Sequence, residues 1–120
     1  MKKAYFKNIV GIGDLYHVKS YYKYDCFDCI FTCEDAQNQL YLCILTSVGT
    51  KVENYSVFRT TPQLLNEYAM RRVSPLYMAK MGDGWVYDIT DDANGVNHSI
   101  QTTVDCSMLS NSLVSNCLLP

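Results

Sequence analysis

The sequence predicts an α+β fold, with one domain built on a mostly antiparallel sheet of four to six strands and one or two short helices packed on one face. Two apolar runs flank a short polar connection, which is typical of a β-hairpin. Two later segments start with Thr-Pro or Ser-Pro ahead of apolar residues, which is typical of helix starts. The chain has 120 residues, 48% hydrophobic and 18% charged, which suits one globular domain over 1–120.

The first half of the chain predicts three strands. "LYHVKSYYKY" (15–24) alternates loosely and is rich in Tyr and Val, so we expect a half-exposed first strand. "CIFTCED" (29–35) and "QLYLCILT" (39–46) are the two arms of the hairpin. Both arms are apolar on both faces, which indicates central strands covered on two sides.

The register of this hairpin depends on the length of its loop. If residues 35–38 form the loop, Cys43 pairs beside Ile30. If the loop has only three residues, Cys43 lies opposite Cys29. The sequence leaves both registers open.

The second half predicts two strands and two helices. "YSVFRTT" (55–61) reads as a strand, and "TTPQLLNEYAMRR" (60–72) as a helix with a Thr cap and Pro in its first turn. "SPLYMAKM" (74–81) repeats that start and predicts a second short helix. After the "GDG" turn, "WVYDIT" (85–90) predicts a further strand, with its Trp packed on the core.

The chain changes character after the loop "DDANG". "VNHSIQTTVDC" (96–106) has the composition of a last strand. The Ser/Asn-rich "SMLSNSLVSNCLLP" (107–120) carries Leu at wide intervals and predicts a short helix or an irregular arm. We therefore expect 95–120 to contain an irregular C-terminal arm within the single domain.

Charge is distributed unevenly along the chain. The net charge is −2, which argues against direct nucleic-acid binding because that needs clustered Lys and Arg. Residues 1–80 carry a balance of +3, whereas 81–120 carry five acids and no Lys or Arg. An acidic segment of this kind is usually a solvated face, but it also suits docking on a basic partner.

Three of the six cysteines stand close together in "YDCFDCIFTC". A zinc site needs thiolates that converge about 2.3 Å from one ion. The residues between these cysteines are strand formers, so Cys29 and Cys33 share one face and Cys26 points to the other. No second Cys or His pair follows at metal spacing, and both histidines are isolated in the sequence. We expect buried cysteines that serve as small apolar residues, with no metal and no cofactor.

Other short motifs do not carry a reaction. "GIGDLY" has two glycines but lacks the third that a nucleotide-binding loop needs, and "DITDDANG" fails the spacing of a calcium loop. Arg59, Arg71 and Arg72 have tyrosines nearby and the chemistry to contact phosphate or an acidic peptide. Such residues more often line strands and end helices.

The segment 13–90 resembles a family of small bacterial and phage proteins associated with mobile elements. "YDCFDCIFTCEDAQNQLYLCIL", "TTPQLLNEYA" and "SPLYMAKMGDGWVYDI" carry the resemblance in this order. Relatives usually have a Pro-Leu-Leu-Phe type of run where Cys29 to Phe31 stand, so the cysteines depart from the pattern. The resemblance implies no active site. It implies a similarity to phage accessory proteins, among which inhibitors of host defence are common.

The leading hypothesis is a non-enzymatic protein-binding module, plausibly a phage or mobile-element inhibitor of a bacterial defence nuclease, of the anti-CRISPR type. The expected partner is a larger protein, such as a nucleic-acid-binding effector with a basic channel, and the expected location is the cytoplasm, because no signal peptide or membrane span is visible. The contact residues expected from charge and tyrosine content are Asp83, Asp88, Asp91, Asp92, Tyr21, Tyr22 and Tyr24.

Two alternatives come from other classes. One is a small metal- or thiol-dependent enzyme that uses Cys26, Cys29 and Cys33. The other is a structural or immunity subunit that forms a homodimer through an exposed sheet edge or the C-terminal arm.

Overall fold

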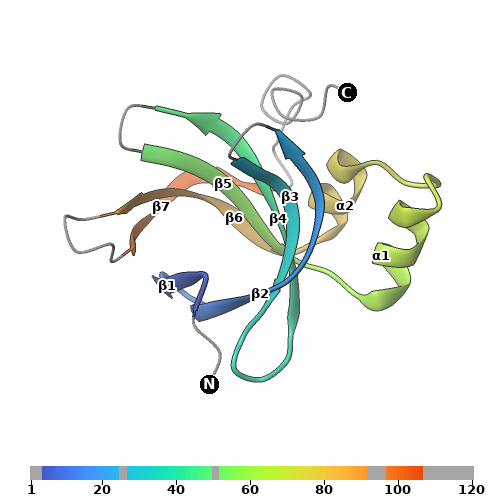
Figure 1. Ribbon diagram of the computed structural model, residues 1–120, viewed down its shortest axis with the longest axis horizontal. Helices are drawn as coiled ribbons and strands as arrows, with labels where there is room; N and C mark the ends of the chain where they lie inside the picture. The colour runs from blue at the N-terminus through green and yellow to red at the C-terminus, as the bar shows by residue number, and fades with distance from the viewer. Residues whose placement is uncertain (1–3, 25–26, 50–51, 92–96, 107–120) are drawn as a thin grey trace.

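The computed structural model describes residues 4–24, 27–49, 52–91 and 97–106. It contains a sheet in which every neighbouring pair of strands is antiparallel and the spatial order follows the chain order, with two short helices between the fifth and sixth strands (Figure 1). The elements are β1 (Phe6–Ile9), β2 (Gly13–Tyr24), β3 (Phe27–Glu34), β4 (Leu40–Val48), β5 (Val52–Arg59), α1 (Pro62–Ala69), α2 (Pro75–Met81), β6 (Gly84–Asp91) and β7 (Asn97–Asp105).

This architecture confirms the mostly antiparallel α+β fold with two short helices. Strands β2 to β7 form one continuous antiparallel sheet of six strands, within the predicted range. The short β1, which the sequence did not predict, adds a seventh strand that pairs with the beginning of β2. Neither helix among the described residues is long and apolar enough to cross a membrane.

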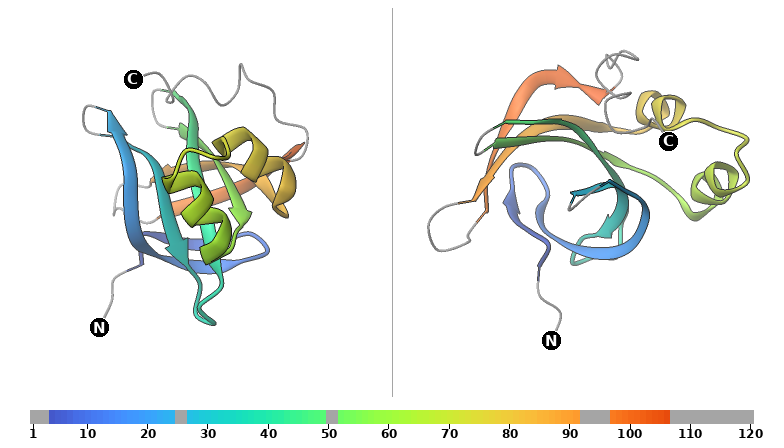
Figure 2. Two further views of the ribbon diagram at one scale, coloured as in Figure 1. Left: turned by 90° about the vertical axis from the view of Figure 1, so that its right-hand side faces the viewer. Right: turned by 45° about the horizontal axis from the view of Figure 1, so that its top comes forward.

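The sheet is curled, and β1 lies inside the curl (Figure 2). Strand β2 changes register against β3 at three points along its length. Such bulges bend a strand and increase its twist, which lets a long strand wrap around the interior.

Side-chain hydrogen bonds tie the β1–β2 turn to the far edge of the sheet. Ser99 Oγ on β7 accepts from the Val10 amide at 3.1 Å and donates to the Asn8 carbonyl at 3.1 Å. The Tyr87 hydroxyl on β6 donates to the Val10 carbonyl at 2.9 Å. The first and last strands are thus joined through polar side chains, which holds the sheet in its curled shape.

The loop between β3 and β4 is organised by one carboxylate. The backbone amides of Gln37 and Gln39 donate to Asp35 Oδ1 at 2.9 and 3.0 Å. Asn38 adopts a left-handed backbone with φ of 65°, a conformation that Asn tolerates better than most residues. These contacts close a loop of residues 35–39.

This loop sets the hairpin register that the sequence left open. Cys43 pairs with Phe31, beside the Ile30–Ile44 pair, and does not lie opposite Cys29. The hairpin itself, predicted from the sequence, is confirmed.

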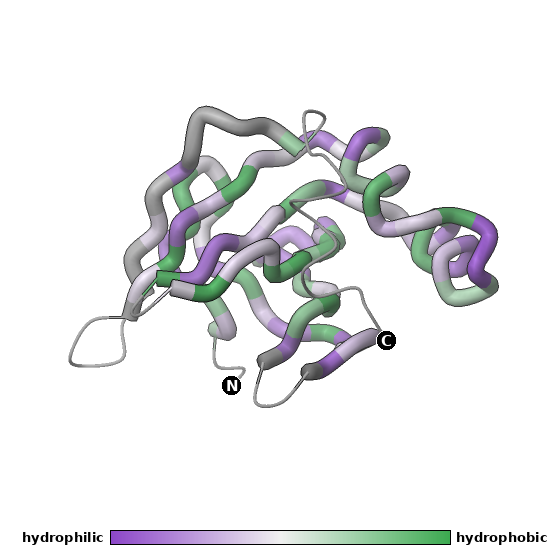
Figure 3. Tube along the Cα trace, turned by 90° about the horizontal axis from the view of Figure 1, so that it is seen from above, coloured by the Kyte–Doolittle hydropathy of each residue, from purple (hydrophilic) through white to green (hydrophobic). Residues whose placement is uncertain are grey.

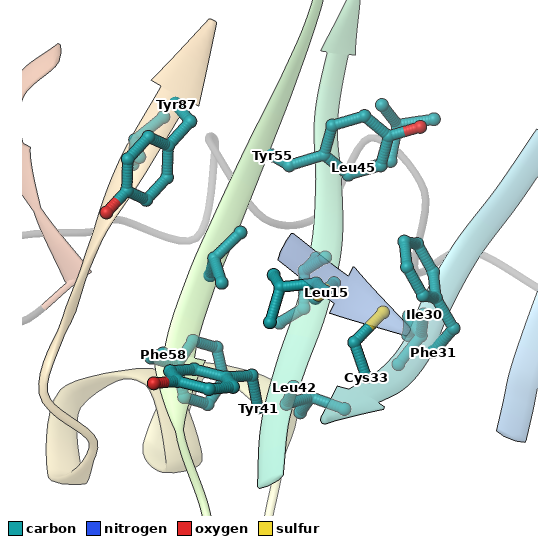
Figure 4. Packing of buried hydrophobic residues seen from close by; sticks show 14 of the residues in the cluster. Leu15, Ile30, Phe31, Cys33, Tyr41, Leu42, Leu45, Tyr55, Phe58 and Tyr87 are labelled. Atoms are coloured by element: carbon teal, nitrogen blue, oxygen red, sulfur yellow. The ribbon is translucent and has the colours of Figure 1, made fainter. Parts of the chain in front are cut away.

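Strands β3 to β6 bury side chains on both faces, which the apolar runs predicted for β3 and β4. Along each strand, buried residues alternate between the inner face, which is the face that turns toward β1, and the outer face. Figure 3 shows how hydrophobic and hydrophilic residues are distributed along the chain. The inner face carries Phe31, Cys33, Tyr41, Cys43, Leu45, Tyr55, Val57 and Tyr87 (Figure 4). The outer face carries Ile30, Thr32, Leu42, Ile44, Ser56, Phe58 and Val86.

The two helices begin where the sequence predicts. Thr61 Oγ1 accepts from the Leu64 amide at 3.2 Å, and Ser74 Oγ accepts from the Tyr77 amide at 3.0 Å, so each cap satisfies an amide that has no partner within the helix. The predicted extent of the first helix, 60–72, is too long. The helix ends at Ala69, and the chain then turns through a left-handed residue, Arg71, with φ of 61°.

The helices lie together on the side of the sheet away from β1 (Figures 1 and 2). Met78 and Ala79 of α2 are fully buried in the common core, whereas α1 buries no residue completely. Leu64, Leu65 and Tyr68 of α1 pack on the core while remaining half-exposed. The second helix is therefore the more firmly anchored of the two.

Candidate functional site

A pocket of about 200 Å³ opens between the β1–β2 turn and the inner face of the sheet. Four strands and one turn contribute to it. The side chains that line it are those of Ile12, Tyr41, Arg59, Asp83, Trp85, Tyr87 and Gln101. We call it the Arg59–Trp85 pocket.

Strand register brings these residues together from distant parts of the chain. Tyr41 on β4 is opposite Arg59 on β5, and Tyr87 on β6 is opposite Gln101 on β7. Trp85 is two residues from Tyr87 on the same strand, so both side chains project to the same face. The antiparallel order of the sheet then places all five side chains on one continuous surface.

The two tyrosines in the walls are fixed by hydrogen bonds. The Tyr41 hydroxyl donates to Asp35 Oδ2 at 3.1 Å and accepts from the Arg59 guanidinium. The Tyr87 hydroxyl donates to the Val10 carbonyl. Burial raises the pKa of Tyr41, and burial raises the pKa of Tyr87 to about 12, so both hydroxyls stay protonated at neutral pH.

The rim of the pocket carries one opposite-charge pair. Arg59 Nη1 lies 3.8 Å from Asp83 Oδ2, and the two side chains are 61% and 85% exposed. A pair this exposed and this long contributes little to stability, because water screens the attraction. Asp83 can therefore leave Arg59 at small cost when another group approaches.

Alkaline pH is expected to reduce the stability that the Tyr87 side chain contributes through its hydrogen bond to the Val10 carbonyl. The folded-state pKa of Tyr87, about 12, lies above its unfolded value of 10.0, so its stabilising contribution is complete below pH 10 and is lost as pH rises through 12. We expect Tyr87→Phe to lose about 1 kcal/mol at pH 8, where wild type keeps the hydrogen bond. Urea unfolding at pH 8 and pH 11 should show the difference between wild type and variant shrinking at the higher pH.

Tyr77→Phe, at an exposed position on α2, is the matched control and should behave like wild type at both values. A difference between wild type and Tyr87→Phe that stays constant up to pH 11 would contradict the assignment.

The acidic residues predicted as contacts do not form one surface within the described part of the chain. Asp83 lies at the pocket rim, whereas Asp88 projects to the outer face of β6 and accepts a hydrogen bond from the Asn54 amide. Asp91 is the last residue of β6, and Asp92 lies outside the described residues. Of the two whose side chains the structure describes, Asp83 lies beside the pocket and Asp88 does not, and a binding role for the set stays a prediction.

The predicted tyrosine contacts lie along β2. The ring of Tyr21 packs against Tyr68 of α1 with centroids 5.4 Å apart, and Lys19 Nζ lies 5.0 Å from the Tyr21 ring. Tyr22 is half-buried opposite Ile30. Tyr24 ends the strand. Tyr21 and Tyr22 therefore pack on the core, and a contact role for the three stays a prediction.

The cysteine arrangement does not support the alternative of a metal or thiol centre on Cys26, Cys29 and Cys33. Cys29 and Cys33 are both buried, but they stand four positions apart on an extended strand, about 13 Å, whereas two sulfurs on one zinc ion lie within about 5 Å. Cys26 lies outside the described residues. Among the residues that the structure describes, no three His, Cys, Asp or Glu side chains are grouped to hold an ion.

The cysteine sulfurs are instead part of the core. Cys33, Cys43 and Cys106 are fully buried thiols. Burial, and then a hydrogen bond with the Cys33 thiol, hold the pKa of Cys43 well above its usual value. A thiol kept protonated and out of contact with solvent is a poor nucleophile. The prediction that these cysteines act as small apolar residues is confirmed for the described ones.

His17, Ser20 and Asp28 form a polar cluster on β2 and β3. The sequence did not predict this cluster. His17 Nε2 is 2.9 Å from Ser20 Oγ and 3.1 Å from Asp28 Oδ2, and Ser20 Oγ donates to the same carboxylate oxygen at 2.9 Å. In a hydrolytic triad the acid and the serine contact different nitrogens of the imidazole. Here both contact Nε2, and the serine proton goes to Asp28, so the histidine is not placed to activate the hydroxyl. The cluster instead links two paired strands.

Comparison with models of protein families, with curated protein sequences and with solved structures found no match to this chain. The resemblance to small phage and bacterial proteins therefore stays a prediction. The geometry of the pocket is the observation from which a function can be argued.

Proposed function

We propose that the chain is a non-enzymatic protein-binding module that receives a side chain of a larger protein in the Arg59–Trp85 pocket. The observation that supports this most is the pocket itself, in which three aromatic rings and one guanidinium meet on the inner face of the sheet.

The size of the pocket favours a protruding side chain over a complete cofactor. Sites for drug-sized ligands and cofactors usually enclose about 300–1,000 Å³. This pocket has about 200 Å³, which is enough for one side chain and too little for a nucleotide or a flavin.

The residue types favour a contact between proteins. Trp, Tyr and Arg are the residues most enriched among those that carry the binding energy of protein interfaces, and they do so in pockets that exclude water. Trp85, Tyr41, Tyr87 and Arg59 supply all three types in one site.

The walls are arranged before a partner arrives. A hydrogen bond to Asp35 holds the Tyr41 ring in place, and a hydrogen bond to the Val10 carbonyl in the β1–β2 turn holds the Tyr87 ring. Side chains that are already ordered lose less conformational entropy on binding, so more of the contact energy remains as affinity.

Capture from a bacterial lysate with matched variants tests the proposal. Gln101→Phe adds a ring to the pocket without changing the charge, and we expect it to lose at least 90% of a partner that wild type captures. Asp88→Asn, on the outer face of the same region, is the control and should retain that partner. A partner retained equally by both variants would contradict the proposal, provided that Gln101→Phe unfolds at the wild-type temperature.

A narrower role, inhibition of a bacterial defence nuclease with a basic channel, stays a prediction within this proposal. It requires an acidic contact surface, but Asp83, which precedes β6, lies at the pocket, whereas Asp88 of β6 projects to the outer face beside Asn54. Identification of the captured partner addresses this role, and light scattering addresses the homodimer alternative.

A further inference from the structure

We infer that the group received by the Arg59–Trp85 pocket is a carboxylate, carried by an acidic side chain of the partner protein. This inference rests on the proposed function and adds the chemistry of the contact to it.

The hydrogen-bonding capacity of the pocket is biased toward donors. The hydroxyl protons of Tyr41 and Tyr87 are already donated to Asp35 and to the Val10 carbonyl, so neither proton is available to a ligand. The guanidinium of Arg59 has five N–H donors and no acceptor, and the indole of Trp85 has one donor and no acceptor. An occupant with two acceptor oxygens matches these groups.

The guanidinium at the rim can exchange its loose partner for such an occupant. Arg59 is the cation among the lining residues, and its partner at the rim, Asp83, is exposed and 3.8 Å away. A planar carboxylate can accept two parallel N–H bonds from a guanidinium, which is stronger and more directional than a loose pair. The incoming carboxylate would take the place of Asp83 beside Arg59, and the Asp83 side chain would then be solvated by water.

Other occupants fit these groups less well. A Lys or Arg side chain has no acceptor to offer the N–H groups of Arg59 and Trp85. A purely aromatic side chain would fill the volume but likewise offer these donors no oxygen. An acidic side chain places its methylene stem against the rings and its oxygens at the guanidinium.

The fluorescence of Trp85 can report this contact, because Trp85 is the single tryptophan of the chain and lines the pocket. The probes are glutamate with both its amino and carboxyl termini blocked, and the matching blocked glutamine of the same shape. We expect the glutamate probe to change Trp85 fluorescence with a Kd on the order of 1 mM, as its small size allows. The glutamine probe should bind at least tenfold more weakly.

Three variants sharpen the test. Arg59→Gln should weaken the glutamate probe at least tenfold, and Arg72→Gln, whose arginine pairs with Glu67 at the end of α1, should leave it unchanged. Asp83→Asn should strengthen binding severalfold, because it removes the carboxylate that competes for Arg59. This last result separates the inference from the hypothesis of an acidic contact surface, under which Asp83→Asn would weaken partner binding.

Three outcomes would overturn the inference: equal responses to the glutamate and glutamine probes, weaker glutamate binding by Asp83→Asn, or tighter binding of N-acetylglycine, which would assign the pocket to a chain terminus. If no carboxylate probe binds while Gln101→Phe still loses the captured partner, the inference fails and the proposed function stands. If Gln101→Phe keeps the partner, the proposed function fails whatever the probes do.

Discussion

Phe31→Ala is expected to lower the free energy of unfolding by about 3–5 kcal/mol, the range for removing a fully buried ring. Phe31 has no exposed surface and lies at the centre of an aromatic group on the inner face. Its ring centroid is 5.0 Å from that of Tyr5 and 5.9 Å from those of both Phe6 and Tyr55. The ring joins β1 to the main sheet, so its loss leaves a cavity that neither element can fill alone.

Urea unfolding followed by circular dichroism measures this change. Val18→Ala on β2 is the control, since the Val18 side chain is 47% exposed, and it should stay within about 0.5 kcal/mol of wild type. A loss below about 1 kcal/mol for Phe31→Ala would show that β1 and the aromatic group do not pack as described.

Gly84→Ala is expected to cost about 3 kcal/mol, the upper part of the range for forcing extra volume into a packed site. A Cβ at Gly84 would lie 2.1 Å from the Val57 carbonyl oxygen and 2.5 Å from Phe58 Cα. Both neighbours are backbone atoms of the paired strand β5, so neither can rotate away. The strand pair must separate at this point, directly beside the Arg59–Trp85 pocket.

The melting temperature and the fluorescence of Trp85 both report this change, because Trp85 follows Gly84 on β6. Gly49→Ala is the matched substitution, since an added Cβ there would approach only the Val52 carbonyl oxygen, at 3.3 Å, on an exposed loop. A Gly84→Ala protein as stable as Gly49→Ala would contradict the close approach of β5 and β6.

Much of the fold follows from local patterns in the sequence. The hairpin of β3 and β4 can be predicted because two apolar runs flank a polar loop. Its burial on both faces can be predicted because polar residues do not alternate with apolar ones in these runs. The helix starts are readable because Thr61 and Ser74 stand directly before Pro. These features depend on residues within a few positions of one another.

The features that escaped prediction depend on contacts between distant residues. Strand β1 has only four residues and includes Asn8 in a left-handed conformation, with φ of 56°, so no periodic pattern marks it. Its place in the fold is set by Ser99, about ninety residues later. The curl of the sheet arises from register shifts in β2, which alternation alone does not reveal.

The candidate site could be predicted only in fragments. The sequence gives Arg59, like Arg71 and Arg72, the chemistry to contact phosphate or an acidic peptide but favours a structural role, and it predicts Trp85 on the core; nothing in their local sequence joins them. Their meeting with Tyr41 and Gln101 requires the registers of three strand pairs. Asp83 and Asp88 are close in sequence, but Asp83 precedes β6 and lies at the pocket, whereas Asp88 of β6 projects to the outer face.

The indole N–H resonance of Trp85 in a ¹H–¹⁵N spectrum reports whether the pocket is occupied, because the chain has one tryptophan and that residue lines the pocket. If a partner side chain enters the pocket, this resonance shifts or broadens when the captured partner is added, and the partner leaves it unchanged in Gln101→Phe. An indole resonance that stays in place while backbone signals elsewhere shift would show that the partner binds another surface.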